Sequence, residues 1–249
     1  MEIRDILFYK TLPHECGYLD NHSATNVVLD PNFEPSSDLY SQLVASGFRR
    51  SGEYVYKPQC HSCNSCISLR VPVEEIKLNR NQRRICKRNS DLDVIRMRVE
   101  YHPEHFALYR RYTAARHPGG PMEQHSKTEY MGFLRSHRID TKLFELRLNG
   151  ELLAVAVTDY LSDSLSAVYT FYDPAHAKRS LGIFAILQQV FEAKSVGKTW
   201  LYLGYWIENC DKMRYKTSFL PTEAYIDGSW TRFNTAQELS MRYNGGLNK

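Results

Sequence analysis

The sequence has no long apolar run. Its longest uninterrupted apolar stretch is Leu152 to Val157, far short of the roughly 20 residues that a membrane-spanning helix requires. The N-terminal segment MEIRDILFYKTL carries charges within its only apolar stretch, so we expect no secretory signal, no membrane partner and a cytoplasmic location. With 43% hydrophobic and 24% charged residues, the composition is typical of a soluble folded chain and argues against disorder and coiled coil.

Cysteine is scarce, and its placement is uneven. Three of the six cysteines lie in KPQCHSCNSCISLRV, residues 57–71. In a reducing cytoplasm we expect thiols or metal ligands rather than disulfides. The repeated Cys-x-x-Cys spacing lets three thiols face one zinc ion or iron–sulfur cluster. A metal-free, cysteine-lined fold and a redox switch remain alternatives. The candidate ligands are Cys60, Cys63 and Cys66, with Cys16, Cys86 or His61 as a fourth.

Net charge is only +4, which says little about partners. The distribution of basic residues says more, because Lys77 to Arg98 is opposed only by Asp91 and Asp93. Such a cluster can contact the phosphates of a nucleic acid, although a solvated charged segment is the simpler alternative. The cluster consists of Lys77, Arg80, Arg83, Arg84, Lys87, Arg88, Arg96 and Arg98.

Regular elements are predicted from residue 104 onward, after an earlier helix at 37–46 that Gly47 ends. Helices are expected at 104–116, 127–137, 180–194 and 211–217. Strands are expected at 143–148, 152–161, 166–172 and 200–203, with a final hairpin at 224–226 and 230–233. Asn149-Gly150 and Asp227-Gly228 are typical of type I′ hairpin turns.

This order predicts an α+β fold with an acetyltransferase-like mixed sheet flanked by helices. In such a sheet the strands before and after the long helix can splay apart, and ligands enter the gap. We expect an N-terminal cysteine-containing domain at 1–95, the acetyltransferase-like transferase domain at 96–240, and a loose tail at 241–249.

The long helix begins with Arg179-Ser-Leu-Gly182-Ile-Phe184. In acyl-CoA-dependent members of that fold, a related Gly-rich stretch exposes backbone amides to a pyrophosphate. Phe184 stands where a small residue is needed, which argues against a conventional acyl-CoA N-acetyltransferase. Arg179 could still bind an anionic group such as a nucleotide phosphate, or it could be a solvated charge at a turn.

Residues 202–216, YLGYWIENCDKMRYK, place aromatic side chains and cations around the end of a strand. Such a mixture suits stacking on an unpaired base, and it also suits an aromatic core with a charged rim. The stretch resembles the C-terminal signature of the aminoacyl-tRNA protein transferases of the N-degron pathway. Cys16-Gly-Tyr-Leu19, Phe48-Arg-Arg-Ser-Gly52 and the segment from Cys60 to Arg70 similarly resemble that family's N-terminal region, so the resemblance covers most of the chain.

The resemblance implies a reaction, in which an aminoacyl group passes from its tRNA to the N-terminus of a protein. In the compact bacterial branch, which this chain most resembles, the donor is Leu-tRNA and the acceptors begin with Asp or Glu. The product is thereby marked for degradation. Tyr205 or Tyr215 could orient the amine or donate to the oxyanion, and Trp206 could stack on the terminal adenosine. Cations suited to the acidic acceptor side chain are Arg179, Lys212, Arg214 and Lys216.

Two departures affect the cysteines. Leu19 stands where larger relatives have a second cysteine, and their adjacent cysteine pair is spread over Cys60, Cys63 and Cys66. Ester aminolysis needs no cofactor, so we expect any metal held with Cys16 to be architectural or regulatory. An arginyl-tRNA donor and a non-enzymatic metal-knuckle tRNA-binding protein remain the alternatives.

Overall fold

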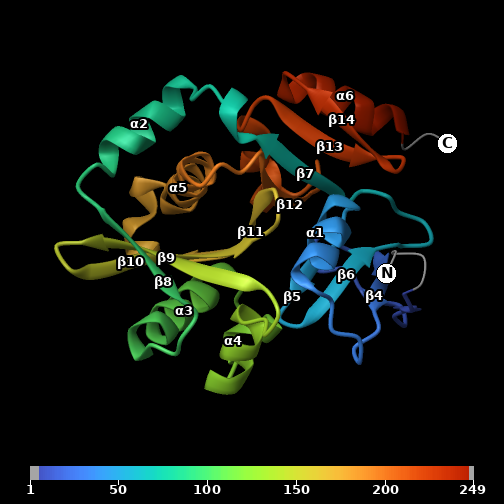
Figure 1. Ribbon diagram of the computed structural model, residues 1–249, viewed down its shortest axis with the longest axis horizontal. Helices are drawn as coiled ribbons and strands as arrows, with labels where there is room; N and C mark the ends of the chain where they lie inside the picture. Colours follow the sequence, from blue (N-terminus) through green and yellow to red (C-terminus); the bar gives the residue numbers. More distant parts are fainter. Residues whose placement is uncertain (1–5, 247–249) are drawn as a thin grey trace.

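The computed structural model describes residues 6–246, and its largest element is a mixed eight-stranded sheet (Figure 1). The strands are β7 (Ile67–Pro72), β8 (Asp93–Arg98), β9 (Asp140–Leu148), β10 (Glu151–Tyr160), β11 (Ser164–Tyr172), β12 (Trp200–Trp206), β13 (Thr222–Ile226) and β14 (Ser229–Phe233). Their order across the sheet is β14-β13-β7-β12-β11-β10-β9-β8. All neighbours pair antiparallel except β11 and β12, which are parallel.

Helices cover both faces of this sheet (Figure 1). On one face, α5 (Leu181–Ser195) packs against β10 and β11 and also against α2 (Arg80–Arg88). On the other face lie α3 (Pro103–Arg116) and α4 (Lys127–Leu134). The ends of α2 and α4 are fixed by capping boxes, Asn79 with Gln82 and Ser126 with Glu129. Central strands such as β10 and β12 are therefore buried on both sides, whereas the edge strands β8 and β14 are largely exposed.

A smaller antiparallel sheet comes from the N-terminal residues. Its order is β1 (Phe8–Lys10), β4 (Asn26–Leu29), β6 (Tyr54–Pro58) and β5 (Arg49–Ser51). Helix α1 (Ser37–Ala45) packs on it through Leu39, Tyr40, Leu43 and Val44, in a core that also includes Tyr202 of the large sheet. Beside it lies a hairpin of two short strands, β2 (His14–Glu15) and β3 (Ser23–Ala24), of two residues each. The remaining elements are η2 (Val73–Glu75), η3 (Pro121–Gln124), η4 (Pro174–Arg179), η5 (Asp211–Ser218) and α6 (Ala236–Gly246).

The predicted α+β fold with an acetyltransferase-like mixed sheet is confirmed. Both predicted hairpin turns are confirmed, since φ is +49° and +89° at Asn149 and Gly150, and +51° and +80° at Asp227 and Gly228. Positive φ at both central residues defines the type I′ turn. The helix expected at 127–137 is shorter, ending at Leu134, because the backbone of Arg135 is extended.

The two expected domains share the large sheet. Strand β7, from the segment expected to form the first domain, lies between β12 and β13. The expected boundary at residues 95 and 96 falls within β8. Residues 241–246, expected to be a loose tail, continue helix α6, and residues 247–249 lie outside the described residues.

Candidate functional site

The parallel strands β11 and β12 part before they end. Their pairing runs from Ser164 with Trp200 to Ser166 with Tyr202, although β11 continues to Tyr172 and β12 to Trp206. Beyond that point no strand formed by residues 6–246 lies beside the edge of β12 that faced β11. This is the gap that the sequence predicts for an acetyltransferase-like sheet, and it places the candidate site.

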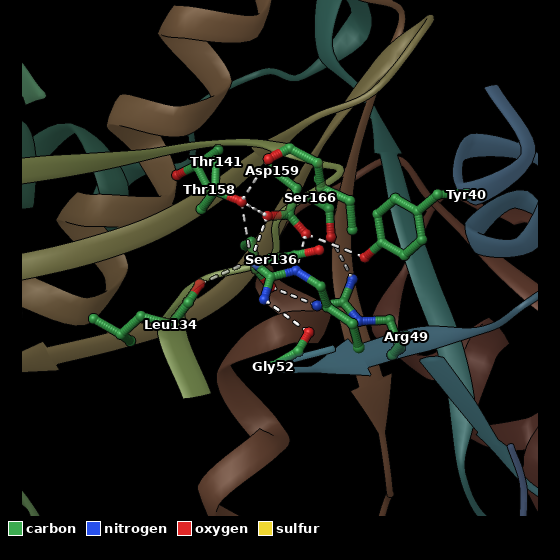
Figure 2. A network of polar contacts seen from close by, with 12 residues as sticks. Tyr40, Arg49, Gly52, Leu134, Ser136, Thr141, Thr158, Asp159 and Ser166 are labelled. Carbon is green, nitrogen blue, oxygen red and sulfur yellow. Dashed lines mark hydrogen bonds and ion pairs between the residues drawn. The ribbon is translucent and has the colours of Figure 1, made fainter. Parts of the chain in front are cut away.

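Arg49, on β5, reaches into this gap. Its guanidinium donates to Ser166 Oγ at 2.9 Å and to the carbonyl oxygen of Ala167 at 2.6 Å, and Figure 2 shows it directed at Ser166. On the other side the guanidinium lies against Gly204, where an added Cβ would be 3.1 Å from Nη2. Gly204 has φ of +79° and follows a bulge in the pairing of β12 with β7. Glycine is required there for its backbone conformation and for this contact.

The neighbouring Arg50 fixes the strand that carries Arg49. It forms a fully buried ion pair with Asp159 on β10, with Nη2 2.6 Å from Oδ1. The same carboxylate accepts hydrogen bonds from Tyr40 at 3.1 Å and Thr141 at 2.7 Å (Figure 2). Arg50 also donates to the carbonyls of Leu134 and Gly52. The two arginines thus differ. Arg50 is paired with a buried carboxylate, whereas the guanidinium of Arg49 lies in the gap and has no such partner within residues 6–246.

A second cation lies next to Arg49. Lys216, in η5, is 9% exposed, and its Nζ donates to the backbone carbonyl of Tyr205 at 2.5 Å. Burial, with the charge of Arg49 as the next cause, lowers the pKa of Lys216 to about 7. Within residues 6–246 neither Arg49 nor Lys216 forms an ion pair with a carboxylate.

A cavity of about 630 Å³ is lined in part by Tyr56 and Tyr205, although neither Arg49 nor Lys216 is among the described residues that line it. Its wall comes from the small sheet, the β2–β3 hairpin, the cysteine segment and the end of β12, and Tyr56 and Tyr205 stand on the side near Arg49. Lys10, His14 and His22 are among the polar lining residues. Most of the others are apolar or aromatic, including Tyr9, Tyr18, Leu19, Ala24, Val28, Pro31, Tyr54, Pro58 and Ile207.

The four predicted cysteine ligands all line this cavity. They are Cys16, Cys60, Cys63 and Cys66, while Cys86 on α2 is elsewhere. Burial raises the pKa of the Cys66 thiol to about 12, and Cys60 and Cys63 add to the shift. Thiolates suit zinc and iron–sulfur clusters, but among the described residues no three His, Cys, Asp or Glu side chains are placed to hold a metal together. As arranged, the thiols line a cavity and do not form a ready metal centre.

The two predicted catalytic tyrosines are placed differently. Tyr205 is 6% exposed, and its hydroxyl lies 2.8 Å from the carbonyl oxygen of Gly47. Tyr215 is 37% exposed, yet burial of its hydroxyl raises the pKa of the phenol to about 12, with Tyr112 and Tyr172 as neighbours. The hydroxyl of Tyr205 therefore donates to a backbone carbonyl. The hydroxyl of Tyr215 forms no hydrogen bond with the described residues.

Other predicted substrate-binding residues lie away from the cavity. Trp206 is 2% exposed and packs in the core, with its ring 5.3 Å from that of Tyr243. Arg179 donates to both carboxylate oxygens of Asp91 at 2.9 Å, and Arg214 is 76% exposed and paired with Asp211. Lys212 is exposed, and its charge helps to lower the pKa of His117, after the larger effect of burial.

The basic residues at 77–98 are all exposed, and five of them lie on α2. Sequence reasoning missed the role of Arg49, although it noted the Phe48-Arg-Arg motif, because nothing local distinguishes one arginine of the pair from the other. It also missed Tyr56, which carries no motif. Only the packing of β5 against β10 and β11 separates their environments.

Comparison with known proteins identifies the relatives of this chain. Residues 14–84 match the family model described as arginine-tRNA-protein transferase, N terminus, and residues 104–226 match the one for the C terminus. A Pseudomonas aeruginosa (strain LESB58) protein named aspartate/glutamate leucyltransferase is 47% identical over 229 residues, covering 92% of this chain and 97% of its own. A Hahella chejuensis (strain KCTC 2396) protein of the same name is 46% identical over 228 residues, with the same coverage of 92% and 97%.

Among solved structures, that of FemX is similar with a TM-score of 0.51, covering 94% of this chain and 90% of that chain. At 9% sequence identity, this likeness concerns the fold alone. Within the described residues, no helix combines the length and the apolar character that crossing a membrane requires.

Proposed function

Because this chain belongs to the arginine-tRNA-protein transferase family, we propose that it transfers leucine from Leu-tRNA to the free N-terminus of proteins that begin with Asp or Glu. Such proteins are thereby marked for degradation by the N-degron pathway. One observation carries the proposal. Two buried cations, Arg49 and Lys216, lie where β11 and β12 part, and Tyr205, whose carbonyl accepts from Lys216, also lines a mainly apolar cavity.

The cavity favours leucine over arginine as the transferred residue. Its lining includes Leu19, Ala24, Val28 and Ile207, and no Asp or Glu is among the described residues that line it. An apolar leucyl side chain gains free energy from such a wall. A buried arginyl group would need a carboxylate partner there. The relatives named leucyltransferases support the same choice.

The chemistry is aminolysis of an activated ester. The α-amine has an ordinary pKa of about 7.7–8.0, so a useful fraction is neutral near pH 7. Its nitrogen attacks the ester carbonyl, the new carbon–nitrogen bond forms, and the carbon–oxygen bond to the tRNA breaks. The proton lost by nitrogen ends on the departing ribose oxygen. Positioning of amine and ester can supply much of the acceleration.

Hydroxyl groups around the gap can serve this reaction. Tyr215 keeps its proton at neutral pH, as an ordinary phenol does, and burial raises its pKa further, to about 12. It can therefore donate a hydrogen bond to the tetrahedral oxyanion. The hydroxyl of Tyr169 on β11 is buried without a partner among the described residues. Tyr205 shapes the cavity wall and binds the carbonyl of Gly47.

Transfer itself needs no cofactor, because neither ester activation nor amine attack depends on a metal here. If a zinc ion or iron–sulfur cluster binds the cavity cysteines, its role is architectural or regulatory. Protein treated with a chelator should therefore keep its transfer rate per folded molecule, as checked by circular dichroism. A folded, chelated protein without transfer activity would contradict this.

The tRNA is expected to use the exposed basic residues. Lys212, Arg116 and His117 are close to Tyr112 and Tyr215 at the gap, where the terminal phosphates of tRNA would approach. The basic residues of α2 would contact more distant phosphates. Such contacts weaken steeply as salt rises.

The decisive experiment incubates the protein with radiolabelled Leu-tRNA or Arg-tRNA and peptides that begin with Asp, Glu or Ala. We expect label from Leu-tRNA on the Asp and Glu peptides only. Label from Arg-tRNA on the same peptides would show that the donor is Arg-tRNA instead of Leu-tRNA. Folded protein that binds tRNA but transfers from neither would favour the non-enzymatic tRNA-binding alternative.

A further inference from the structure

We propose that Arg49 and Lys216 together bind the side-chain carboxylate of the acceptor's first residue, and so determine its specificity for Asp and Glu. The identity of the ligand, an acidic N-terminal residue, rests on the proposed function. The site itself rests on the geometry of the two cations. The burial of Arg49 is not visible from its sequence motif.

The first argument is charge. Arg49 is 7% exposed and Lys216 is 9% exposed, and within residues 6–246 no carboxylate pairs with either. Burying an unpaired charge costs several kcal/mol, roughly, so buried charges in proteins are almost always paired. Arg50, one residue away, follows that rule through Asp159. The Arg49–Lys216 site departs from it, which is expected if its anion arrives with the substrate.

The second argument is the supply of donors. Arg49 uses one N–H of each terminal nitrogen, on Ser166 and Ala167, and a guanidinium has five N–H donors. Lys216 uses one donor, on Tyr205, and an ammonium has three. The unused N–H groups are oriented by these bonds, which reduces the entropy lost when a carboxylate binds. A carboxylate with two oxygens can accept from both side chains.

The third argument is location. Arg49 influences the phenols of both Tyr56 and Tyr205, which line the cavity, and also that of Tyr215. Arg49 therefore lies close to two tyrosines of the cavity that we assign to the leucyl group, and also to the phenol of Tyr215. An acceptor whose side chain is anchored here has its α-amine only a few bonds away, beside the ester. Anchoring the carboxylate thus positions the nucleophile.

The fourth argument is the state of Lys216. Its pKa is lowered to about 7, first by burial and then by Arg49, so free protein holds it only partly charged at neutral pH. A bound carboxylate favours the charged form and must raise this pKa. A neutral amide in the same place would not. The difference gives a direct measurement of binding that does not involve transfer.

The first experiment compares Arg49→Met and Arg49→Lys with the wild type, using peptides that begin with Asp or with its neutral isostere Asn. We expect Arg49→Met to raise the KM for the Asp peptide by about 30-fold or more, with the KM for Leu-tRNA unchanged. The preference of Arg49→Met for the Asp peptide over the Asn peptide should fall by a similar factor. Arg49→Lys should recover part of the affinity for the Asp peptide and part of this preference. Arg232→Gln, at an exposed ion pair with Glu75, is the control for a lost arginine.

An Arg49→Met protein that folds and keeps the wild-type preference for Asp over Asn would overturn the assignment. Wild-type protein that transfers nothing would instead contradict the proposed function. The two failures are therefore distinguishable.

The second experiment uses the wild type and does not require a folded variant. The Lys216 side-chain signals are titrated by NMR in isotope-labelled protein, alone and with saturating Asp or Asn peptide. We expect the Asp peptide to raise the pKa of Lys216 by at least about one unit, and the Asn peptide to leave it unchanged. Saturation by the Asp peptide without such a shift would overturn the proposal, whatever the transfer assay gives.

Discussion

Arg50 and Asp159 form an ion pair in which neither side chain is exposed, and their nitrogen and oxygen lie 2.6 Å apart. The pair connects β5 of the small sheet to β10 of the large one. Because Arg49 precedes Arg50 on the same strand, this connection also sets the depth at which Arg49 enters the gap between β11 and β12.

Arg50→Met should lower the free energy of unfolding by about 3–5 kcal/mol, because it leaves Asp159 buried without its partner. Thermal unfolding should shift accordingly, by about 2–4 °C per kcal/mol for a chain of this length. Arg232→Gln removes the exposed pair with Glu75, and we expect it to change stability far less, because exposed ion pairs contribute little. Equal effects of the two substitutions would contradict the role assigned to the buried pair.

Gly204→Ala should impair both stability and transfer. The substitution imposes a left-handed conformation on alanine, about 1–2 kcal/mol, and puts its Cβ 3.1 Å from Arg49 Nη2. Gly150→Ala is the matched control, since φ is +89° there and a Cβ would meet nothing within 4 Å. Gly150→Ala should therefore lower stability through backbone strain alone and leave the position of Arg49 unchanged. Unfolding measurements and the KM for an Asp peptide separate the two effects.

Lys216 should make stability depend on pH. Its pKa is about 7 in the folded protein against an ordinary value of 10.5. Between these values the unfolded chain binds more protons, so stability should rise with pH, by up to about 1.4 kcal/mol per unit. Below pH 7 both states are protonated and this contribution to the slope disappears.

Urea unfolding at pH 6 to 10 checks this expectation. Lys216→Met should lose the rise above pH 7, whereas replacement of the exposed Lys87 should keep it. A wild-type slope that Lys216→Met leaves unaltered would assign the dependence to other groups.

Tyr205→Phe should lower stability, whereas Tyr215→Phe should lower kcat. Loss of the Tyr205 hydroxyl leaves the carbonyl of Gly47 with a lost hydrogen bond, so we expect about 1 kcal/mol less stability and little change in kcat. Loss of the Tyr215 hydroxyl should lower kcat by about 10-fold or more with stability nearly unchanged. Single-turnover transfer and thermal unfolding measure the two quantities, and reversed effects would exchange the roles.

Local signals were enough for most strands and for the long helix between residues 140 and 233, but not for helix α6. Asn149-Gly150 and Asp227-Gly228 determine their turns through their own backbone preferences, and α5 begins and ends within a residue or two of its expected limits. Helix α2 was not predicted, because its nine residues hold Ile85 and Cys86 among five cations. The single buried face that it presents to α5 is a tertiary feature.

The site was less accessible to sequence reasoning than the fold. Trp206 was read as a stacking residue, yet on β12 it points into the core, where it packs with Leu203 and Tyr243. The burial of Lys216 and the gap position of Arg49 both depend on residues more than 100 positions apart, such as Arg49 with Ser166. No local pattern encodes such a pairing.

The position of β7 constrains how the molecule can assemble. Its residues are translated long before β12 and β13, the two strands that flank it. A nascent chain that ends within α5 therefore holds β7 with both hydrogen-bonding edges open, which invites pairing with another chain. Strands β8 to β11 can pair with one another earlier, but β7 can enter the sheet only after β12 has been made, and the parting of β11 from β12 arises at that later step. The candidate site at this gap is thus completed only after β12 has been made, so chains that end within α5 lack it.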